Sequence, residues 1–197
     1  MTLLSRTNNI VTLTVVLFSF LFLSAANAKS YSEFKKGTNF PKTNEVFTNQ
    51  KLLKKANGKN TKVKIDISEQ RIKLYVNDKV AICSPATTGK KYKRTPKGNF
   101  KITEKIQNKR SSIFGKLYRG KKMVYKGDRR KYKGKYTRYQ GAALKSWMRL
   151  TSDGIGIHGS KYIFRVPHSN GCVRVPYDVV GKIYSSVGTG TKVSVVQ

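Results

Sequence analysis

The side chains best suited to attack a carbonyl and move a proton lie close together in the last quarter of the chain. The sequence has two histidines and two cysteines, and both histidines fall within about fifteen residues before Cys172. A thiol becomes a strong nucleophile when it loses its proton, and a nearby imidazole takes that proton readily. The spacing therefore indicates nucleophilic catalysis by Cys172, with His158 or His168 as the base.

Glycines next to these residues fit the same chemistry. Gly171 leaves no side chain just before the sulfur, so a substrate carbonyl can approach and backbone N–H groups can hold an oxyanion. The alternative is a metal site, for which His158, His168 and Cys172 offer three ligands at an unconventional spacing. We favour the nucleophile and expect neither a metal nor a cofactor.

The second cysteine, Cys83, leaves two interpretations open. A single structural disulfide is common in exported proteins, and spacing alone does not exclude it. A bridge to Cys172 would consume the nucleophile, however. We therefore expect Cys83 to be buried and unpaired.

Alternating apolar and polar residues predict the strands that begin the domain. This alternation runs over residues 63–67 and 72–76, and a turn at Asn77 and Asp78 leads into a third strand at 80–83. Residues 87–98 are basic and rich in turn formers, which predicts a loop. The alternation resumes at Phe100 and Ile102.

Residues 115–145 form a separate unit with twelve Lys or Arg, five Tyr, five Gly and a single acidic residue, Asp128. Basic residues interleaved with aromatics can bind single-stranded nucleic acid. We favour a basic excursion or lid, formed by a loop or β-hairpin that overhangs the domain.

The remaining elements carry the histidine and end the domain. Strands at 147–151 and 155–158, joined by a turn at 152–154, would deliver His158. An apolar stripe at i, i+3, i+4 and i+7 predicts a helix between Pro176 and Gly188; its members are Val180, Ile183, Tyr184 and Val187. A last strand at 192–196 completes a mainly β domain over residues 61–197.

The N-terminal sixty residues show two other patterns. Residues 1–28 carry Arg6, an apolar run of about 14 residues and an Ala-Asn-Ala ending, which predict a signal peptide cleaved after Ala28. An uncleaved membrane anchor is the alternative, but a spanning helix needs about 20 apolar residues. Residues 29–60 are basic and aperiodic, so we expect a flexible leader with at most a short helix at 49–56.

The charge is extreme, with 41 Lys and Arg against 9 Asp and Glu. Arg6 is the only basic residue before residue 29, so cleavage would leave 40 basic side chains and a formal charge near +31. Such a field attracts polyanions. For an exported protein we expect anionic wall polymers, membrane headgroups or acidic peptides rather than nucleic acid, and no transmembrane segment after cleavage.

The residues around the site resemble the signature of the L,D-transpeptidases (the YkuD-type domain). In that family, His-Gly is followed after a dozen or more residues by Ser-x-Gly-Cys-hydrophobic-Arg. The matching residues here are His158, Gly159, Ser169, Asn170, Gly171, Cys172, Val173 and Arg174. Further similar stretches lie at 95–98, 111–115, 141–142, 147–151 and 188–191, so the resemblance covers roughly residues 61–197.

The resemblance implies a β-sandwich-like catalytic domain in the periplasm or cell wall that acts on peptidoglycan stem peptides. Cys172 would attack the carbonyl between an L-centre of diaminopimelate and a terminal D-alanine, and His158 would move the proton. The Gly159 carbonyl would orient His158. The N–H groups of Gly171 and Cys172 would form the oxyanion hole. Ser169 would shape the turn.

The acyl group would then pass to the amine of a second stem. Arg174 and Asn170 would bind substrate, although a structural salt bridge fits Arg174 equally well. Two features depart from the family: Asn170 stands where histidine is common, and residues 115–145 are unusually basic and aromatic. His168 lies two residues before Asn170 and is not its equivalent.

Three other functions remain open at this point. Water as acceptor would make the protein an L,D-carboxypeptidase, and a protein lysine as acceptor would make it a wall-protein anchoring enzyme. A non-catalytic, polybasic wall-binding protein is the third alternative, although the intact signature argues against it.

Overall fold

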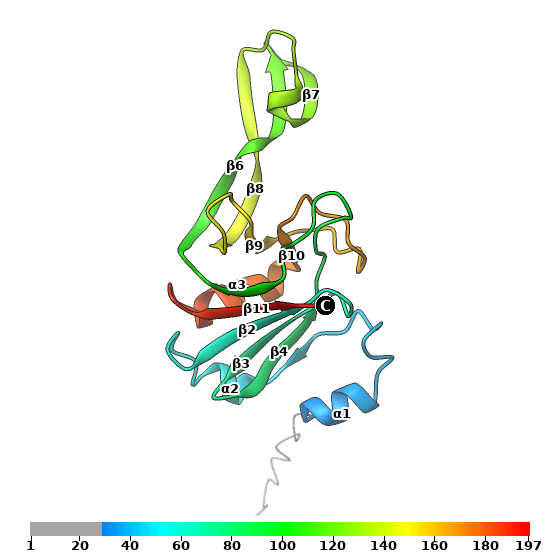
Figure 1. Ribbon diagram of the computed structural model, residues 1–197, viewed down its shortest axis with the longest axis vertical. Helices are drawn as coiled ribbons and strands as arrows, with labels where there is room; N and C mark the ends of the chain where they lie inside the picture. The colour runs from blue at the N-terminus through cyan, green and yellow to red at the C-terminus, as the bar shows by residue number, and fades with distance from the viewer. Residues whose placement is uncertain (1–28) are drawn as a thin grey trace, which may run out of the picture.

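A computed structural model of the chain describes residues 29–197, which form two β-sheets with one helix between them (Figure 1). The predicted signal peptide, and the membrane anchor that is its alternative, lie outside these residues. Among residues 29–197, no helix has the length and apolarity needed to cross a membrane.

The first sheet has six strands and contains the predicted N-terminal hairpin. In spatial order its strands are β1 (Phe47–Thr48), β4 (Lys79–Pro85), β3 (Arg71–Val76), β2 (Thr61–Asp66), β11 (Lys192–Val196) and β5 (Gly98–Lys101). Asn77 and Asp78 have φ values of 47° and 61°, the positive values that favour a tight β-hairpin. The last strand, β11, pairs in parallel with β2, so the C-terminal end of the domain lies next to its first strand.

The second sheet has five strands and carries the site. In spatial order they are β10 (Val173–Val175), β9 (Gly156–Gly159), β8 (Arg138–Arg149), β6 (Glu104–Arg119) and β7 (Lys122–Asp128). The strand predicted at 147–151 is the end of the longer β8. Most neighbours are antiparallel, but β10 runs parallel to β9.

Helix α3 (Tyr177–Ser186) packs between the sheets. Val179, Val180 and Ile183 are buried in a core that also takes residues from both sheets. Close approach of α3 to β9 depends on Gly159, where a Cβ would lie 2.6 Å from a Tyr177 ring carbon. The sequence-based prediction of a mainly β, sandwich-like domain with one C-terminal helix is confirmed.

The prediction of a flexible leader at residues 29–60 is corrected by the structure. This segment forms α1 (Tyr31–Lys36), strand β1 and α2 (Gln50–Leu53), the last within the predicted short helix. Phe34 and Phe47, which looked scattered in the sequence, are buried against Cys83. Phe34, Phe40 and Phe47 show no periodic spacing in the sequence, so only their contacts in the folded chain reveal that the segment is ordered.

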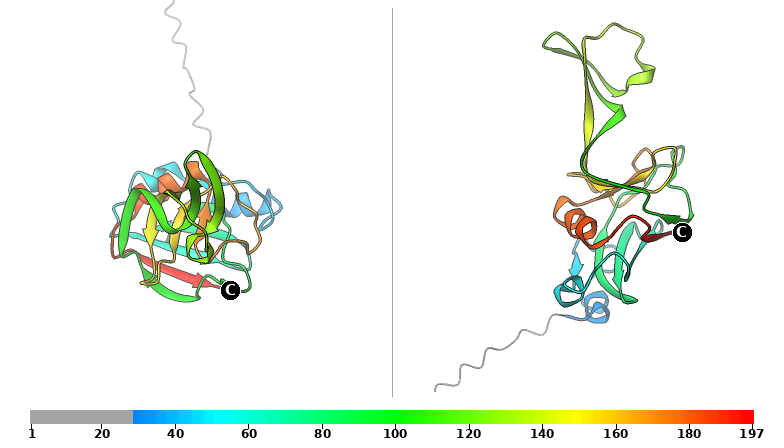
Figure 2. Two further views of the ribbon diagram at one scale, coloured as in Figure 1. Left: turned by 90° about the horizontal axis from the view of Figure 1, so that it is seen from above. Right: turned by 90° about the vertical axis from the view of Figure 1, so that its left-hand side faces the viewer.

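Residues 111–141, which we call the arm, consist of the distal parts of β6 and β8 together with β7 and the 3₁₀ turn η1 (Arg129–Lys131). The hairpin expected here is present. Figures 1 and 2 show, however, that the arm stands away from the body instead of lying over it. The expected overhang is therefore corrected: β6 and β8 continue outward from the second sheet as one long ribbon.

Candidate active site

Strands β9 and β10 bring the segments of His158 and Cys172 next to each other. In the parallel register His158 lies opposite Arg174, and Ile157 lies opposite Val173. Cys172 comes one residue before Val173, so it falls beside Gly156. Residues opposite each other on neighbouring strands point to the same face, so the His158 imidazole and the Arg174 guanidinium share one face. The charge of Arg174 acts on His158 and also on Cys172, which lies just before β10.

His158 is held by its own neighbour. Its Nδ1 lies 2.9 Å from the backbone oxygen of Gly159, the contact that the family resemblance implies. A carbonyl oxygen only accepts hydrogen bonds, so Nδ1 carries the proton and Nε2 keeps its lone pair. Burial, together with the positive charge of Arg174, lowers the pKa of His158 to about 4, although the Gly159 hydrogen bond opposes this shift. His158 is therefore a neutral base at pH 7.

The Cys172 thiol is also neutral at rest. Its Sγ lies 3.8 Å from the Gly154 carbonyl, to which it can donate its proton. Burial raises the pKa of Cys172, while the Gly156 backbone hydrogen bond and the charge of Arg174 lower it. In the part of the chain described, Sγ forms no hydrogen bond with His158. Proton transfer therefore requires the thiol to turn from Gly154 toward the imidazole.

The turn before Cys172 is organised by Ser169, which is buried. Its hydroxyl donates to the Cys172 carbonyl at 2.5 Å and accepts the Gly171 N–H at 3.1 Å. Gly171 has a φ of +113°, in the region that favours glycine. Thr95 supports the same turn from the 87–98 loop by donating to the Gly171 carbonyl at 2.7 Å.

This arrangement corrects one expectation about the oxyanion hole. The Gly171 N–H is occupied by the Ser169 hydroxyl, because the turn folds the amide back onto that side chain. Among the contacts of residues 29–197, the Cys172 N–H has no acceptor. The Cys172 N–H thus remains an unoccupied backbone donor at this turn.

Arg174 is half-buried, and its charge acts on both His158 and Cys172. Burial lowers the pKa of its guanidinium, although the thiol of Cys172 opposes this shift. Within the described chain no carboxylate pairs with Arg174, so the salt-bridge alternative has no partner there. Asn170 is exposed at the turn. The arrangement offers a cation that can bind a substrate carboxylate.

The other histidine, His168, lies elsewhere on the loop. Its ring is exposed and packs 4.5 Å from the ring of Phe164, and its backbone N–H donates to the Thr88 carbonyl. In the described part of the chain no three metal-ligating side chains are grouped. Both cysteines are free, and Cys83 is fully buried beneath the N-terminal segment, as predicted.

Sequence reasoning missed three supporting residues. Trp147 is buried with its ring 6.4 Å from that of His158, and its indole N–H donates to Glu104 at 2.8 Å. Thr95 reaches the catalytic turn from 76 residues away. Trp147 and Thr95 lie in stretches that resemble the family, but their roles depend on contacts distant in sequence.

Comparisons with known proteins agree with this geometry. The family model of the L,D-transpeptidase catalytic domain matches residues 60–195. No curated protein sequence matches the chain. Three similar solved structures are L,D-transpeptidases. The enzyme from Mycobacterium smegmatis has 18% sequence identity to this chain and a TM-score of 0.53. The enzyme from Stackebrandtia nassauensis has 21% identity and a TM-score of 0.51, and a mutant of the enzyme from Enterococcus faecium has 22% identity and a TM-score of 0.51.

The alignments cover 69%, 71% and 69% of this chain, and 58%, 57% and 49% of the three structures in the same order. The chain thus spans less than two thirds of each of them. At these identities the likeness concerns the fold.

Proposed function

This chain belongs to the L,D-transpeptidase catalytic-domain family, and from that premise we propose that it is an exported cysteine acyltransferase that cross-links peptidoglycan stem peptides. One observation carries the proposal. A neutral imidazole tethered through Nδ1 shares one face of β9 and β10 with Arg174, which has no carboxylate partner among residues 29–197, and the charge of Arg174 also acts on the Cys172 thiol just before β10.

In the first transfer, Cys172 takes the acyl group of the donor stem. The thiol proton passes to Nε2 of His158 as Sγ bonds to the carbonyl carbon before the terminal D-alanine. The Cys172 N–H stabilises the negative oxygen of the tetrahedral intermediate. The C–N bond then breaks, His158 gives its proton to the departing amine, and a thioester remains.

In the second transfer, the side-chain amine of another stem attacks the thioester. A new amide bond forms and the C–S bond breaks. The proton lost by the amine returns to the sulfur through His158, so the resting enzyme is regenerated. Water in place of the amine would give a carboxypeptidase, and a protein lysine would give wall-protein anchoring.

The charges fit an acidic substrate and acidic surroundings. Stem peptides carry free carboxylates, and Arg174 can bind one of them close to the reacting carbonyl. The basic arm would attract anionic wall polymers over a longer distance. Export to the periplasm or wall rests on the sequence pattern of residues 1–28.

The test is to incubate the chain from residue 29 with a purified disaccharide tetrapeptide and to identify the products by mass spectrometry. We expect free D-alanine together with a cross-linked dimer. Free D-alanine with only a tripeptide would identify the carboxypeptidase. An unchanged tetrapeptide would support a non-catalytic wall-binding protein.

A further inference from the structure

The segment before the family domain, residues 29–49, contacts the loop that carries the site. We call this segment the strap, and residues 160–171, between His158 and Cys172, the catalytic loop. The strap precedes the family match, which begins at residue 60. It nevertheless adds β1 to the edge of the first sheet, with Phe47 opposite Cys83.

Arg71 of β3 binds the strap through hydrogen bonds to its backbone. Its side chain is fully buried and donates to the backbone oxygens of Pro41 at 3.1 Å, Glu45 at 3.3 Å and Thr43. Its guanidinium also lies 5.1 Å from the ring centre of Phe40. The buried charge is thus compensated by strap carbonyls and an aromatic face.

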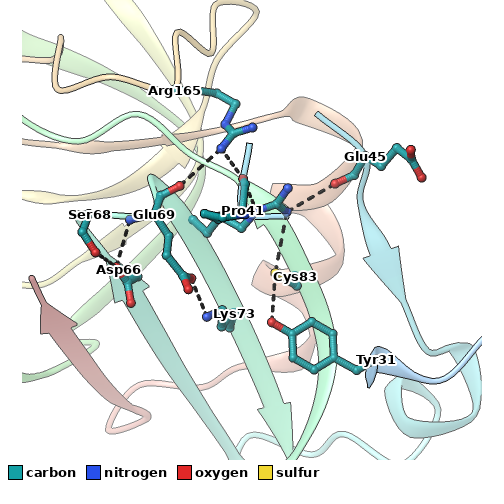
Figure 3. A network of polar contacts seen from close by, with 10 residues as sticks. Tyr31, Pro41, Glu45, Asp66, Ser68, Glu69, Lys73, Cys83 and Arg165 are labelled. Carbon is teal, nitrogen blue, oxygen red and sulfur yellow. Dashed lines mark hydrogen bonds and ion pairs between the residues drawn. The ribbon is translucent and has the colours of Figure 1, made fainter. Parts of the chain in front are cut away.

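Arg165, which lies in the catalytic loop, donates hydrogen bonds to some of the same strap carbonyls. Its guanidinium donates to the backbone oxygens of Thr43 at 2.6 Å, Lys42 and Pro41, with a longer contact of 3.4 Å to Glu69. Figure 3 shows the Arg165 side chain pointing toward the Pro41 and Glu69 oxygens. Pro41 and Thr43 therefore accept hydrogen bonds from both arginines.

This sharing makes the loop dependent on the strap. Without the strap carbonyls, the guanidinium groups of Arg71 and Arg165 would be neighbouring like charges with few acceptors. Arg165 also has a positive φ of 54° and a buried Nε that has no hydrogen-bond partner among residues 29–197. Such a conformation persists when surrounding contacts impose it, and at Arg165 the strap supplies most of them.

Hydrogen bonds on both sides of Arg165 connect the catalytic loop to the turn that carries Cys172. On one side of Arg165, the Phe164 N–H donates to Thr87 Oγ1 at 2.8 Å. On the other side, the Ser169 N–H donates to the Thr88 carbonyl at 2.9 Å. Ser169 then fixes the turn at Cys172 through its hydroxyl.

We propose that Arg165 is a positioning residue and that the strap is a working part of the active site, because together they hold the catalytic loop in the conformation that presents Cys172. This inference rests on the proposed function for its kinetic readout only. An open pocket of ≈ 490 Å³ also lies between strap and loop, with Asn44 on one side and Ser160 and Lys161 on the other.

The test compares Arg165→Met with the parent chain from residue 29 at a temperature where both are folded. Two quantities are measured: the rate of Cys172 acylation by a carbapenem, and amide hydrogen exchange across residues 164–172. We expect acylation to slow by about tenfold or more, since small displacements of reacting groups have large effects on rate, and loop exchange to accelerate. Arg165→Lys, which keeps a cationic donor, should recover part of both.

Two further variants separate positioning from general stability. Arg138→Met removes a matched arginine that lies over Tyr118 in the arm, and it should change neither quantity. Phe34→Ala loosens the strap at its buried aromatic cluster without touching the loop, and it should accelerate loop exchange. It also keeps the test decisive if Arg165→Met does not fold.

Unchanged acylation and unchanged loop exchange in either Arg165→Met or Phe34→Ala would overturn the proposal. A lower melting temperature alone would also overturn it, since that would make the strap purely a stabilising element. If the parent itself takes up no carbapenem, the proposed function fails, but the exchange measurement still decides whether the strap holds the loop.

Discussion

At the residue scale, the site consists of two neutral groups and not of a preformed thiolate–imidazolium pair. Burial raises the pKa of Cys172 and lowers that of His158, so both shifts disfavour the charged forms. Arg174 stabilises a thiolate but opposes an imidazolium. In the proposed mechanism the thiol therefore keeps its proton until a substrate binds, and the proton moves during the attack.

This electrostatic arrangement predicts an unusual pH profile. His158 acts as a base only while it is unprotonated, and its pKa in the folded protein is about 4 instead of the ordinary 6.5. The acylation rate should therefore stay level as pH falls from 7 to about 5.5 and should decline only toward pH 4. The measurement is the rate of carbapenem acylation as a function of pH.

A decline centred near pH 6.5 would contradict the assignment of a buried, neutral base. The same shift affects stability. Below pH 6.5 the unfolded chain binds a proton at His158 that the folded chain does not bind. The free energy of unfolding should therefore decrease as pH falls from 6.5 to about 4.

The two histidines should differ sharply when each is replaced. His158→Ala removes the base and should slow acylation roughly 10²–10⁴-fold. His168→Ala removes an exposed ring packed on Phe164, and its effect should stay below about tenfold. Acylation rates of the two purified variants decide the matter. Similar losses at both positions would refute the choice of His158.

At the scale of elements, the catalytic turn depends on one hydroxyl. Ser169→Ala would leave the buried Gly171 N–H and the Cys172 carbonyl without their partner, which costs about 1–3 kcal/mol of stability. Acylation should slow as well, because the turn places Sγ. Denaturant unfolding and acylation rates measure the two effects.

Ser185→Ala is the matched control. Its hydroxyl bonds to the Lys182 carbonyl on the exposed side of α3, so its loss should leave both quantities almost unchanged. If Ser169→Ala behaves like Ser185→Ala, the turn does not need its hydroxyl.

The sequence predicted those elements whose signal is local. Alternation located β2 and β3, and the apolar stripe located α3, because each pattern reports burial of one face. The turn at Asn77 and Asp78 located the start of β4. His158 and Cys172 could be proposed from the sequence because the chain has only two histidines and two cysteines. The strap escaped detection because Phe34, Phe40 and Phe47 meet only after the chain has folded.

The same limit explains the corrections at the site. The hydrogen bond from Gly171 to Ser169 depends on a positive φ that no sequence pattern specifies. The direction of the arm depends on how far β6 and β8 continue together, with a register shift between Arg110 and Gly115. No sequence pattern indicates the register shift between β6 and β8 or the outward direction of the arm.

At the scale of the whole molecule, the arm carries eleven of the 40 basic side chains of residues 29–197. The arm stands off the body and carries stacked tyrosines, such as Tyr125 and Tyr132, together with arginines over aromatic rings. A surface of this kind should retain the protein on an anionic wall without taking part in acylation.

Neutralising part of the arm should therefore weaken wall binding alone. The variant replaces five basic residues by Gln: Arg129, Arg130, Lys131, Lys133 and Lys135. Binding to isolated sacculi should weaken and depend less on salt, because screening shortens the range of exposed charges from about 10 Å at 0.1 M to about 3 Å at 1 M. Acylation by a carbapenem should be unchanged.

A body variant with the same loss of charge is the control, and its five positions are Lys35, Lys36, Lys54, Lys55 and Lys59. It should weaken wall binding less than the arm variant if the position of the charge matters. Loss of acylation with intact wall binding in the arm variant would instead assign the arm to the catalytic site.

The most direct test of the whole account is intact-mass spectrometry after exposure to a carbapenem. The thiol would open the strained lactam, so the adduct carries the entire molecule. We expect one adduct per chain on the parent protein and on Cys83→Ala, whose thiol is buried away from the site, and none on folded Cys172→Ala. An adduct that persists on Cys172→Ala, or an unmodified parent, would contradict the assignment of Cys172 as the nucleophile.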